Sequence, residues 1–291
     1  MRLAIIDQKD ITIKIDNGAI KLPMHNIPLN LIDIVLLNHQ ATLHTNDILK
    51  LTKANLSILI IASNNNHIAL ISSANSKNAE LKLAQYRSLE YKMEFAHYFL
   101  RQKFTHHHAQ LKANGMDIQL DLALNHLKIA KSIDEMMGIE GAFARDYFEK
   151  FFTLISQNFH KSQRSKKPPL DPLNAMLSFW YSLIYNIITI KLLSHGFEPS
   201  IGYLHQAFRR HNALSSDILE IFRAAINQAV LGIFKNELLE IKDFSYKNGG
   251  VYLKYEGRKK IWKEFVAFVE ILKPQIDHEI ATIRKMIDEK I

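Results

Sequence analysis

The chain has 291 residues, of which 47% are apolar, so it can bury a large core and a disordered chain is excluded. It contains no cysteine, which excludes a disulfide scaffold, a thiolate zinc site and a cysteine nucleophile. The formal net charge of +8 favours a polyanionic partner such as a nucleic acid, although many soluble proteins are equally basic.

The apolar stretches do not have the pattern of membrane segments. Residues 1–20 alternate between apolar and polar types, which is not typical of a signal peptide. The longest apolar run, residues 177–193, includes several serines, an asparagine and a lysine, and therefore suits a buried helix better than a membrane span. We expect a cytoplasmic protein with no membrane partner.

Residues 1–75 have the pattern of a β-rich domain. Residues 11–15 alternate as in a half-buried strand, and the Asp-Asn-Gly sequence at 16–18 predicts a hairpin turn before a strand at 19–22. The continuous apolar run 56–62 predicts a strand covered on both faces. We also expect strands at 3–6, 32–37 and 67–72, a turn at 64–66 and a helix at 45–51.

The pattern becomes helical after residue 75, so we predict an α+β fold: a β-rich domain at 1–75 and a larger helical domain at 76–291. A turn at 248–250 predicts a β-hairpin within 244–255. The expected helices are 80–112, 117–137 with a stop at Gly138, 139–159, 172–195, a short helix carrying His205, a helix from 215 to about 239, and 257–291.

The stretch 202–223 combines residue types that can serve phosphate chemistry. Asp217 and Glu220 are three residues apart on the expected helix, so both carboxylates share one face. Together with His205 they could hold a divalent metal, but an ordinary helix N-terminus beside a buried histidine has the same pattern. Nearby arginines could neutralise phosphate: Arg209, Arg210 and Arg223.

Two other charged segments remain open to a functional or a structural reading. Glu140 falls in the first turn of its expected helix, where acidic residues also interact favourably with the helix dipole. Residues 160–169 carry four cations and no apolar residue before the prolines, so we expect an exposed loop that either grips phosphate or is only solvated. The histidines at 106–108 must point in different directions on a helix, and we interpret them as a solvated patch.

Five segments together resemble a known family. They occur in this order: GIEGAFARDYF (138–148), LDPLNAMLSFWYSLIYN (170–186), GFEPSIGYLH (196–205), SSDILEIFR (215–223) and DFSYKNGGVYLKYEGRKKI (243–261). With the β-rich first and helical second domain, the chain resembles the CRISPR adaptation integrase, number one in the CRISPR-associated protein series. Trp180 and Ala224 depart from the family pattern at positions that concern packing.

The resemblance implies a metal-dependent DNA endonuclease and integrase that inserts short DNA segments into a CRISPR array by phosphodiester transesterification. It implies that Glu140, His205 and Asp217 are catalytic and hold the metal, and that Glu220 reaches the metal through water. Carboxylate and imidazole ligands without thiolate suit Mn²⁺ and also accept Mg²⁺. We expect Asn174 or Tyr181 to orient His205.

The resemblance also implies partners: double-stranded and branched DNA, a second copy of the chain joined through the β-rich domain, and a small ferredoxin-like protein, number two in the same series. The candidates for contacts to the DNA backbone, which position DNA without reading its sequence, are Lys166, Lys167, Arg209, Arg210 and Arg223. Two alternatives stay open, namely a non-catalytic dimeric DNA-binding scaffold and a structure-selective DNA repair nuclease.

Overall fold

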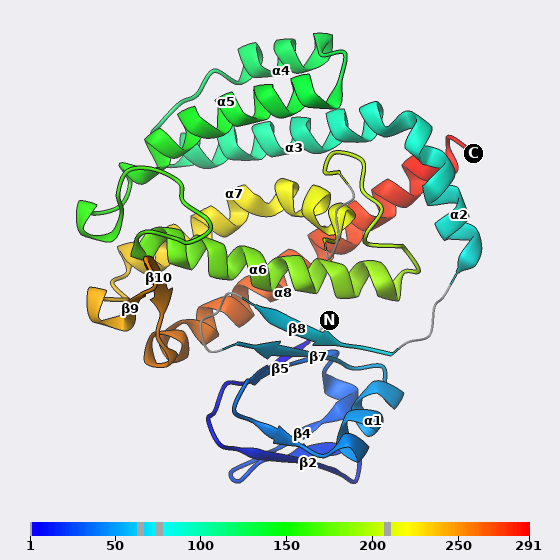
Figure 1. Ribbon diagram of the computed structural model, residues 1–291, viewed down its shortest axis with the longest axis vertical. Helices are drawn as coiled ribbons and strands as arrows, with labels where there is room; N and C mark the ends of the chain where they lie inside the picture. Colours follow the sequence, from blue (N-terminus) through cyan, green and yellow to red (C-terminus); the bar gives the residue numbers. More distant parts are fainter. Residues whose placement is uncertain (1, 63–66, 74–77, 207–210) are drawn as a thin grey trace. The chain divides into compact units, whose positions relative to one another are not determined.

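A computed structural model describes residues 2–62, 67–73, 78–206 and 211–291 (Figure 1). The chain divides into two compact units, which are Met1–Ser76 with Arg258–Ile276, and Lys77–Gly257 with Asp277–Ile291. The predicted α+β fold is confirmed, because strands dominate the first part, helices the second, and a small hairpin lies near the end. The predicted turn at 64–66 lies outside the described residues.

The first unit contains a four-stranded sheet of order β1-β5-β7-β8. The first three strands pair in parallel, and β8 pairs antiparallel with β7. Because parallel strands are usually covered on both faces, β5 and β7 consist of almost continuous apolar runs, as predicted for 56–62. The strands are β1 (Leu3–Ile6), β5 (Ile34–Asn38), β7 (Ser57–Ile61) and β8 (Ile68–Ile71).

A second four-stranded sheet has the order β4-β3-β2-β6. Its alternating side chains Ile13, Ile15 and Ile20 join Val35 and Leu37 of β5 in one core. Two short strands, β4 and β6, were not predicted, because each has too few residues to show a period. The elements are β2 (Thr12–Asp16), β3 (Ala19–Lys21), β4 (Asn26–Pro28), η1 (Leu29–Leu31), β6 (Thr42–Leu43) and α1 (Thr45–Lys53).

The second unit is a helical bundle in which α3 packs against both α5 and α7, and α6 packs against α7 (Figure 1). Helix α8 contributes residues to both units. The elements are α2 (Ala79–Arg87), η2 (Ser88–Tyr91), α3 (Lys92–Ala113), α4 (Leu120–Ile129), α5 (Ile133–Phe152), η3 (Gln157–Phe159), α6 (Pro172–Ser194), α7 (Ala213–Lys235), η4 (Ile241–Asp243), β9 (Phe244–Lys247), β10 (Gly250–Leu253) and α8 (Tyr255–Asp288).

Helix α6 is long and apolar enough to cross a membrane, but most of its side chains are buried inside the protein. Trp180 and Leu183 are fully buried, and the Thr189 hydroxyl lies 2.8 Å from the hydroxyl of Ser215 on α7. The helix begins as predicted, with Pro172 in the first turn and the Asp171 side chain accepting from the Asn174 N–H. It is therefore a core helix of the bundle.

The predicted helix stop at Gly138 is wrong. Helix α5 runs through Gly138 without a break and begins at Ile133, after Ser132, whose hydroxyl accepts from the Glu135 N–H. The predicted helix 117–137 is therefore α4 and the start of α5. Glu140 lies inside α5 and not in its first turn, so the helix-dipole interpretation of Glu140 does not apply.

Two further helix predictions are corrected. The predicted helix 80–112 is interrupted by the 3₁₀ turn η2, which separates α2 from α3. The segment around His205 has no helix within its described residues 196–206. The Asp217 carboxylate accepts hydrogen bonds from the backbone N–H groups of residues 203–205. A side chain that accepts several successive N–H groups offers the backbone an alternative to helical hydrogen bonds.

Candidate active site

One cavity of about 810 Å³ in the helical unit collects most of the predicted site residues. Glu140 comes from α5, Glu220 and Arg223 come from α7, and His205 comes from the loop before α7. Lys103 of α3, which the sequence did not single out, lines the same cavity. Residues that are far apart in the chain therefore meet where α3, α5 and α7 pack together.

Lys103 joins the two glutamates. Its Nζ lies 2.6 Å from Oε2 of Glu220 and forms a short ion pair with Oε1 of Glu140. The Lys103 side chain is 5% exposed, so this ammonium group has almost no access to bulk water. Each glutamate thus uses one carboxylate oxygen on Lys103.

Arg223 forms a second ion pair with Glu220. Its Nε lies 2.8 Å from the same Oε2, and its guanidinium group lies over the Tyr181 ring, 4.5 Å from the ring centroid. The Tyr181 hydroxyl donates to Asn227 on α7. Arg223, predicted to contact DNA, is therefore packed inside the site against Glu220 and an aromatic face, which is a favourable place for an arginine.

The two cations decide the charge of Glu220. Burial alone would raise the pKa of Glu220, but the positive charges of Arg223 and Lys103 outweigh burial and hold this pKa well below its usual range. Burial lowers the pKa of Lys103, and the carboxylates of Glu220 and Glu140 outweigh that effect and raise it above its ordinary value. Glu220 is therefore ionised and Lys103 charged at neutral pH.

Asp217 has a different role from Glu220 although both lie on one side of α7. It is fully buried, and its Oδ2 accepts from the N–H groups of Tyr203 at 2.6 Å and Leu204 at 3.1 Å. Its Oδ1 accepts from the N–H of His205 at 2.9 Å and lies 2.7 Å from Nδ1 of the same histidine. Both oxygens are therefore used to fold the loop and orient the imidazole.

The expectation that Asn174 or Tyr181 orients His205 is therefore wrong, and Asp217 performs this role. Asn174 instead holds the loop that precedes α6, and Tyr181 is bonded to Asn227. That Asp217 is itself a metal ligand stays a prediction. Both of its oxygens already accept hydrogen bonds, which favours Glu220 for direct ligation. The remaining imidazole nitrogen, Nε2, faces Glu220 Oε1 at 3.9 Å.

The loop that carries His205 is fixed to α2 and α3 as well as to Asp217. Gln85 donates to the carbonyl oxygen of Ile201 at 2.8 Å, and the Tyr203 ring stacks on Phe95 with centroids 4.0 Å apart. At Gly202 an added Cβ would lie 2.8 Å from Asp217 Oδ2 and 2.7 Å from the Ala213 backbone, so only glycine allows this close approach. The loop is thus built to present His205 to the cavity.

The basic loop 160–169 is only partly as predicted. Arg164 is not solvated: it donates to Asn174 Oδ1 at 2.9 Å and lies 5.6 Å from the Tyr181 ring centroid. Lys166 lines the cavity and is accessible to solvent. Partial desolvation at the cavity wall, followed by the charge of Arg223, lowers the pKa of Lys166. Lys167 is exposed. The loop therefore forms one wall of the cavity, and Arg209 and Arg210 lie outside the described residues.

The interpretation of histidines 106–108 as a solvated patch is wrong for His107. This side chain is 2% exposed, its Nδ1 lies 2.8 Å from the Lys103 carbonyl oxygen, and its ring meets the Tyr147 ring edge-on. Burial, followed by the charge of Lys103, lowers the pKa of His107 to about 3. The three histidines do make separate contacts, since His106 reaches the Ile221 carbonyl and His108 lies beside Asp117.

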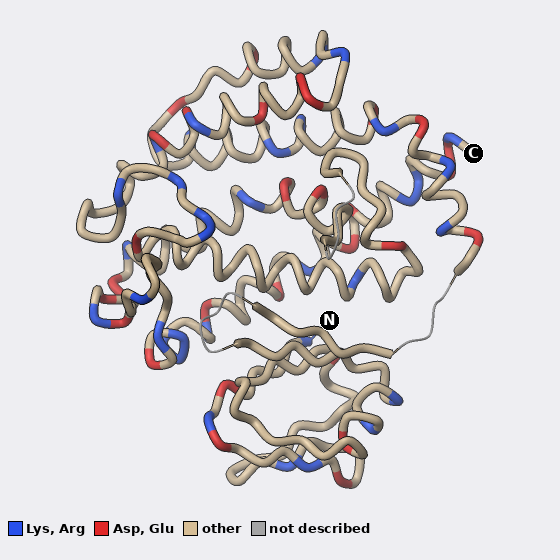
Figure 2. Tube along the Cα trace, viewed as in Figure 1, with Lys and Arg blue, Asp and Glu red and all other residues tan. Residues whose placement is uncertain are grey.

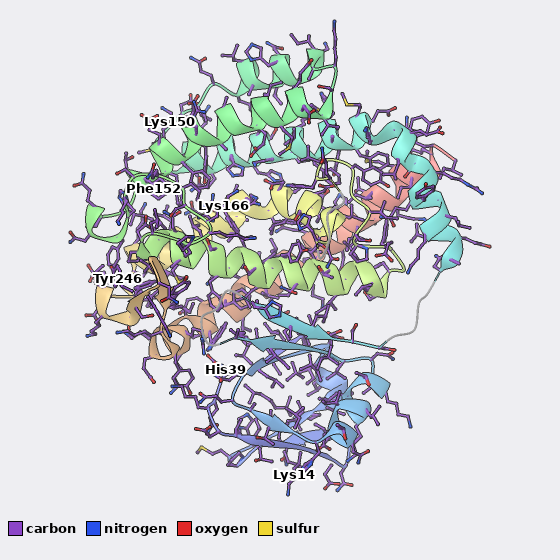
Figure 3. All side chains as sticks on the ribbon, viewed as in Figure 1. Lys14, His39, Lys150, Phe152, Lys166 and Tyr246 are labelled. Atoms are coloured by element: carbon purple, nitrogen blue, oxygen red, sulfur yellow. The ribbon has the colours of Figure 1, made fainter. Side chains whose placement is uncertain are left out.

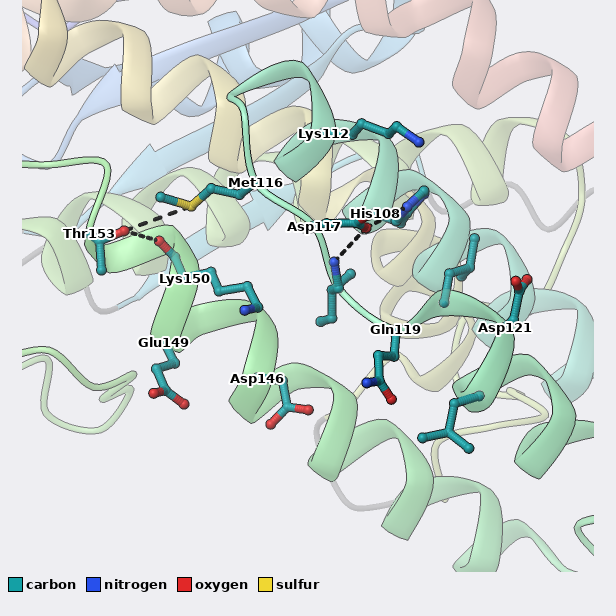
Figure 4. Close-up of a pocket in the computed structure, with 13 residues that line it drawn as sticks. His108, Lys112, Met116, Asp117, Gln119, Asp121, Asp146, Glu149, Lys150 and Thr153 are labelled. Carbon is teal, nitrogen blue, oxygen red and sulfur yellow. Dashed lines mark hydrogen bonds and ion pairs between the residues drawn. The ribbon is translucent and has the colours of Figure 1, made fainter.

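A larger cavity of about 1320 Å³ contains none of the predicted site residues (Figure 4). It is lined by the end of α3, the loop before α4 and one face of α5, and Asp146, Glu149 and Lys150 line its α5 side. Figure 2 shows that basic residues are spread over many elements, so net charge alone does not locate a binding surface. Size and charge are poorer guides to the site than the convergence of side chains.

Lys103 could have been found from the sequence through its spacing. Phe95, Phe99, Lys103 and His107 follow each other at intervals of four on α3, which places them on one helical face. All four side chains are buried. A lysine on an otherwise apolar face is rarely buried without a carboxylate partner, and this pattern could have pointed to the glutamates.

No three His, Asp or Glu side chains within residues 2–62, 67–73, 78–206 and 211–291 lie close enough to hold a metal ion by themselves. The hydrogen bonds and ion pairs of the described residues leave Oε2 of Glu140 unused, and Oε1 of Glu220 has only the 3.9 Å approach to His205. Two carboxylates and one imidazole thus each have a donor atom without a close partner, and all three residues line one cavity, with Lys103 paired to both carboxylates.

Residues 4–267 match the sequence profile of a family described as CRISPR associated protein Cas1. The chain is 28% identical over 292 residues to CRISPR-associated endonuclease Cas1 1 of Thermodesulfovibrio yellowstonii, covering 93% of this chain and 92% of the relative.

Solved structures share the fold. A CAS1 protein from Thermotoga maritima matches with a TM-score of 0.90 at 21% identity, covering 99% of this chain and 97% of that one. A casposase bound to integration product matches at 0.83 and 24%, covering 92% and 83%. A chain of a Cas6-RT-Cas1–Cas2 complex matches at 0.82 and 19%, covering 99% of this chain and 35% of that one. Because the family profile spans most of the sequence, the chain belongs to the Cas1 family of CRISPR-associated proteins.

Proposed function

We propose that this protein is a metal-dependent DNA endonuclease and integrase that inserts short DNA segments into a CRISPR array. The observation that carries the proposal is the convergence of Glu140, Glu220 and His205, from three separate elements, in one cavity lined by cations. Family membership supports it, as do a relative named as an endonuclease and a structural neighbour bound to an integration product. The proposed substrate of this chain is DNA.

The chemical types of the donor atoms suit a divalent metal, and binding one would require the three side chains to move closer together than they lie in this structure. Glu140 Oε2, Glu220 Oε1 and His205 Nε2 would hold it, and Lys103 already acts as a cation shared by the two carboxylates. Carboxylate oxygens and one imidazole, without thiolate, suit Mn²⁺ or Mg²⁺. When bound, such an ion supplies a Lewis acid that neutralises phosphoryl oxygens and lowers the pKa of an attacking hydroxyl group.

The protein side chains prepare this centre. The Asp217 carboxylate accepts a hydrogen bond from Nδ1 of His205, so Nε2 is the ring nitrogen that faces Glu220 and could bind a metal. Arg223 and Lys103 keep Glu220 ionised, since protonation would remove a ligand. Lys166, at the accessible wall of the cavity, is available to a phosphate oxygen.

The proposed reaction is attack by the 3′-hydroxyl of a short duplex on a phosphodiester of the repeat DNA. A new oxygen–phosphorus bond forms, the bond to the leaving 3′-oxygen breaks, and that oxygen takes up a proton. With water as nucleophile the same site would hydrolyse branched DNA. Lys166, Lys167, Arg209 and Arg210 are proposed to contact the DNA backbone.

Two partners are also proposed. A homodimer joined through the strand-rich unit would present two such sites. A small ferredoxin-like protein, number two in the series, would hold the pair together, in line with the Cas1–Cas2 complex that shares the fold. A chain that stays monomeric in gel filtration at every concentration would contradict the dimer.

The test compares carboxamide variants in two assays with Mn²⁺: cleavage of branched DNA, and joining of a short duplex to a supercoiled plasmid carrying a CRISPR repeat. Glu140→Gln and Glu220→Gln should each lower both rates by more than about 100-fold, because each removes a charged ligand. Asp217→Asn should lower both rates by about 10- to 100-fold because His205 is no longer oriented. Asp146→Asn, an exposed acid on the same helix as Glu140, is the matched control.

The result distinguishes the alternatives. Unchanged rates in Glu220→Gln would remove Glu220 from the site and overturn the proposed centre. DNA binding without any metal-dependent turnover would favour the non-catalytic scaffold. Cleavage of branched DNA without joining to the plasmid would favour the repair nuclease.

A further inference from the structure

We propose that a groove between α4 and α5 binds an amphipathic helix of another protein, one whose apolar face is flanked by lysines and arginines. The α4–α5 groove is a mostly apolar hollow of about 610 Å³ in the helical unit, and Figure 1 shows the two helices side by side at the edge of that unit. None of the residues proposed as metal ligands lines it. The groove is therefore a second surface, and its role does not depend on the proposed function.

Helix α4 has apolar residues on two faces, and the helical unit buries only one of them. Ala123 and Leu127 are buried. Leu122 and Ile129 are seven residues apart, which places them on one face, and they are 50% and 71% exposed. Both line the groove. Single exposed apolar residues are ordinary, but two on one helical face beside an apolar hollow indicate a surface for a partner.

The α5 side of the groove includes small residues that leave room for a partner. Gly138 and Ala142 are one helical turn apart, exposed, and both line the groove. A Cβ added at Gly138 would meet no described atom within 4 Å, so packing within this chain does not require a glycine there. Glycine inside a helix is less stable than alanine, and its missing side chain lets another backbone approach closely.

The charge around the groove is opposite in sign to that of the whole chain. Glu135 and Asp146 line the groove, His126 is the other titratable lining residue, and no lysine or arginine of the described chain lines it. Residues 117–150, which span both helices, carry seven Asp and Glu against four Lys and Arg, whereas the formal net charge of the chain is +8. This local charge disfavours phosphate groups and attracts a basic partner.

The walls of the groove suit a helix better than an extended strand. Both walls are α-helices, whose main-chain groups are bonded within each helix, so the groove offers no strand edge to extend. An amphipathic helix can instead place apolar side chains between Leu122 and Ile129 and its backbone over Gly138. Glu135 and Asp146 are eleven residues apart on α5, about 16 Å, so cations about three turns apart on the partner can pair with both.

The test measures binding of two labelled synthetic helices of about three turns, the length of α4, to the full-length chain by fluorescence anisotropy. A hydrocarbon staple keeps them helical, because short helices are unstable in water. Both peptides carry leucines along one face, and their flanks carry lysines in one and glutamates in the other. The lysine peptide should bind at least about 10-fold more tightly, because acids line the groove. The net charge of the chain would favour the glutamate peptide, so this preference reports the local charge.

Two variants locate the binding in the groove. Leu122→Gln with Ile129→Gln removes the exposed apolar side chains, and Gly138→Leu fills the groove while raising helix propensity. Each should weaken binding of the lysine peptide at least about 10-fold. Leu83→Gln, which changes an exposed leucine of α2 in the same unit, is the control and should bind like the unaltered chain. Circular dichroism identifies variants that fold, and Gly138→Leu keeps the test decisive if the double variant does not.

Three results would overturn the proposal. The first is equal binding of the two peptides, or unchanged binding of the lysine peptide by the folded groove variants. The second is no binding to the unaltered chain, and a sedimentation mass that falls in the double variant would then assign the groove to a second copy of this chain. The third is weaker binding of duplex DNA by the double variant, which would assign the groove to nucleic acid. None of these measurements needs a metal ion, so failure of the proposed function would leave them unaffected.

Discussion

The two units each contain a buried ion cluster. In one cluster both oxygens of the central carboxylate have close partners, and we call it closed; in the other one oxygen has no close partner, and we call it open. In the strand-rich unit, Asp7 at the end of β1 accepts from Arg258 Nε at 2.9 Å and Nη2 at 3.0 Å. It also accepts from Trp262 Nε1 at 3.0 Å and Asn38 Nδ2 at 2.7 Å. Both carboxylate oxygens are fully used, and the cluster binds the last helix to the sheet of its own unit.

In the helical unit, the cluster around Glu220 is open. Lys103 and Arg223 both approach Oε2, while Oε1 faces the cavity and His205. A closed cluster of this kind contributes specificity of packing, whereas an open one retains unused donor atoms beside strong positive charge. The difference between the two clusters indicates that carboxylate oxygens without close partners beside a cavity identify the reactive cluster. Burial of charge alone does not identify it.

The largest expected effect would test the closed cluster. Asp7→Ala should lower the free energy of unfolding by about 3–5 kcal/mol, because it removes the buried carboxylate that accepts from Arg258, Trp262 and Asn38. Urea unfolding followed by circular dichroism measures this. Asp10→Asn, an exposed acid in the same unit, should change stability little. A decrease below about 1 kcal/mol would mean that the Asp7 cluster contributes no more to stability than an exposed ion pair does.

A smaller effect concerns His107, which lies under the open cluster. Its pKa in the folded protein is about 3 against an ordinary 6.5, so the unfolded chain binds the proton more readily. The stability contributed by neutral His107 is fully present above pH 6.5 and falls by about 1.4 kcal/mol per pH unit as the pH drops toward 3. At pH 5 the decrease should be about 2 kcal/mol.

His107→Gln should flatten this pH dependence, measured as the unfolding free energy between pH 7 and pH 5. His126→Gln, at an exposed position in the helical unit, should leave the dependence unchanged. A dependence that persists in His107→Gln would assign it to other groups of the cluster.

The smallest expected effect concerns DNA binding by the lysines of the cavity wall. Lys166→Ala with Lys167→Ala should weaken DNA binding and reduce the slope of log affinity against log salt by about 0.9 for each duplex phosphate that these lysines neutralise. Lys14→Ala, an exposed lysine in the strand-rich unit (Figure 3), is the control and should leave the slope as it is. An unaltered slope in the double variant would make the loop a purely structural wall.

Much of the fold was predictable because it depends on local periodicity. Alternation located β2, an apolar run located β7, and an aspartate followed by proline located the start of α6. The glycine stop signal at Gly138 predicts the wrong helix boundary, because the capping hydrogen bond of Ser132 governs the start of α5. Local patterns compete, and tertiary packing decides among them.

The site was predictable only in part. Family resemblance selected Glu140, His205, Asp217 and Glu220, and helical spacing put the last two on one side of α7. Their different roles depend on the loop at 203–205, because its backbone N–H groups donate to Asp217 and not to Glu220. The spacing of Lys103 on the buried face of α3 predicts a buried lysine, but it does not predict that its partners are Glu140 and Glu220, because these ion pairs join three helices.

Helix α8 has a consequence for how the protein is made. Its residues Arg258–Ile276 belong to the strand-rich unit, although the strands of that unit end with β8 at Ile71. During synthesis, the early strands must therefore wait for roughly 200 further residues before their unit is complete, which takes roughly 10–40 seconds at ordinary translation rates. Until then Arg258 and Trp262, two of the partners of Asp7, do not exist, and the nascent strands expose a surface that a chaperone can bind.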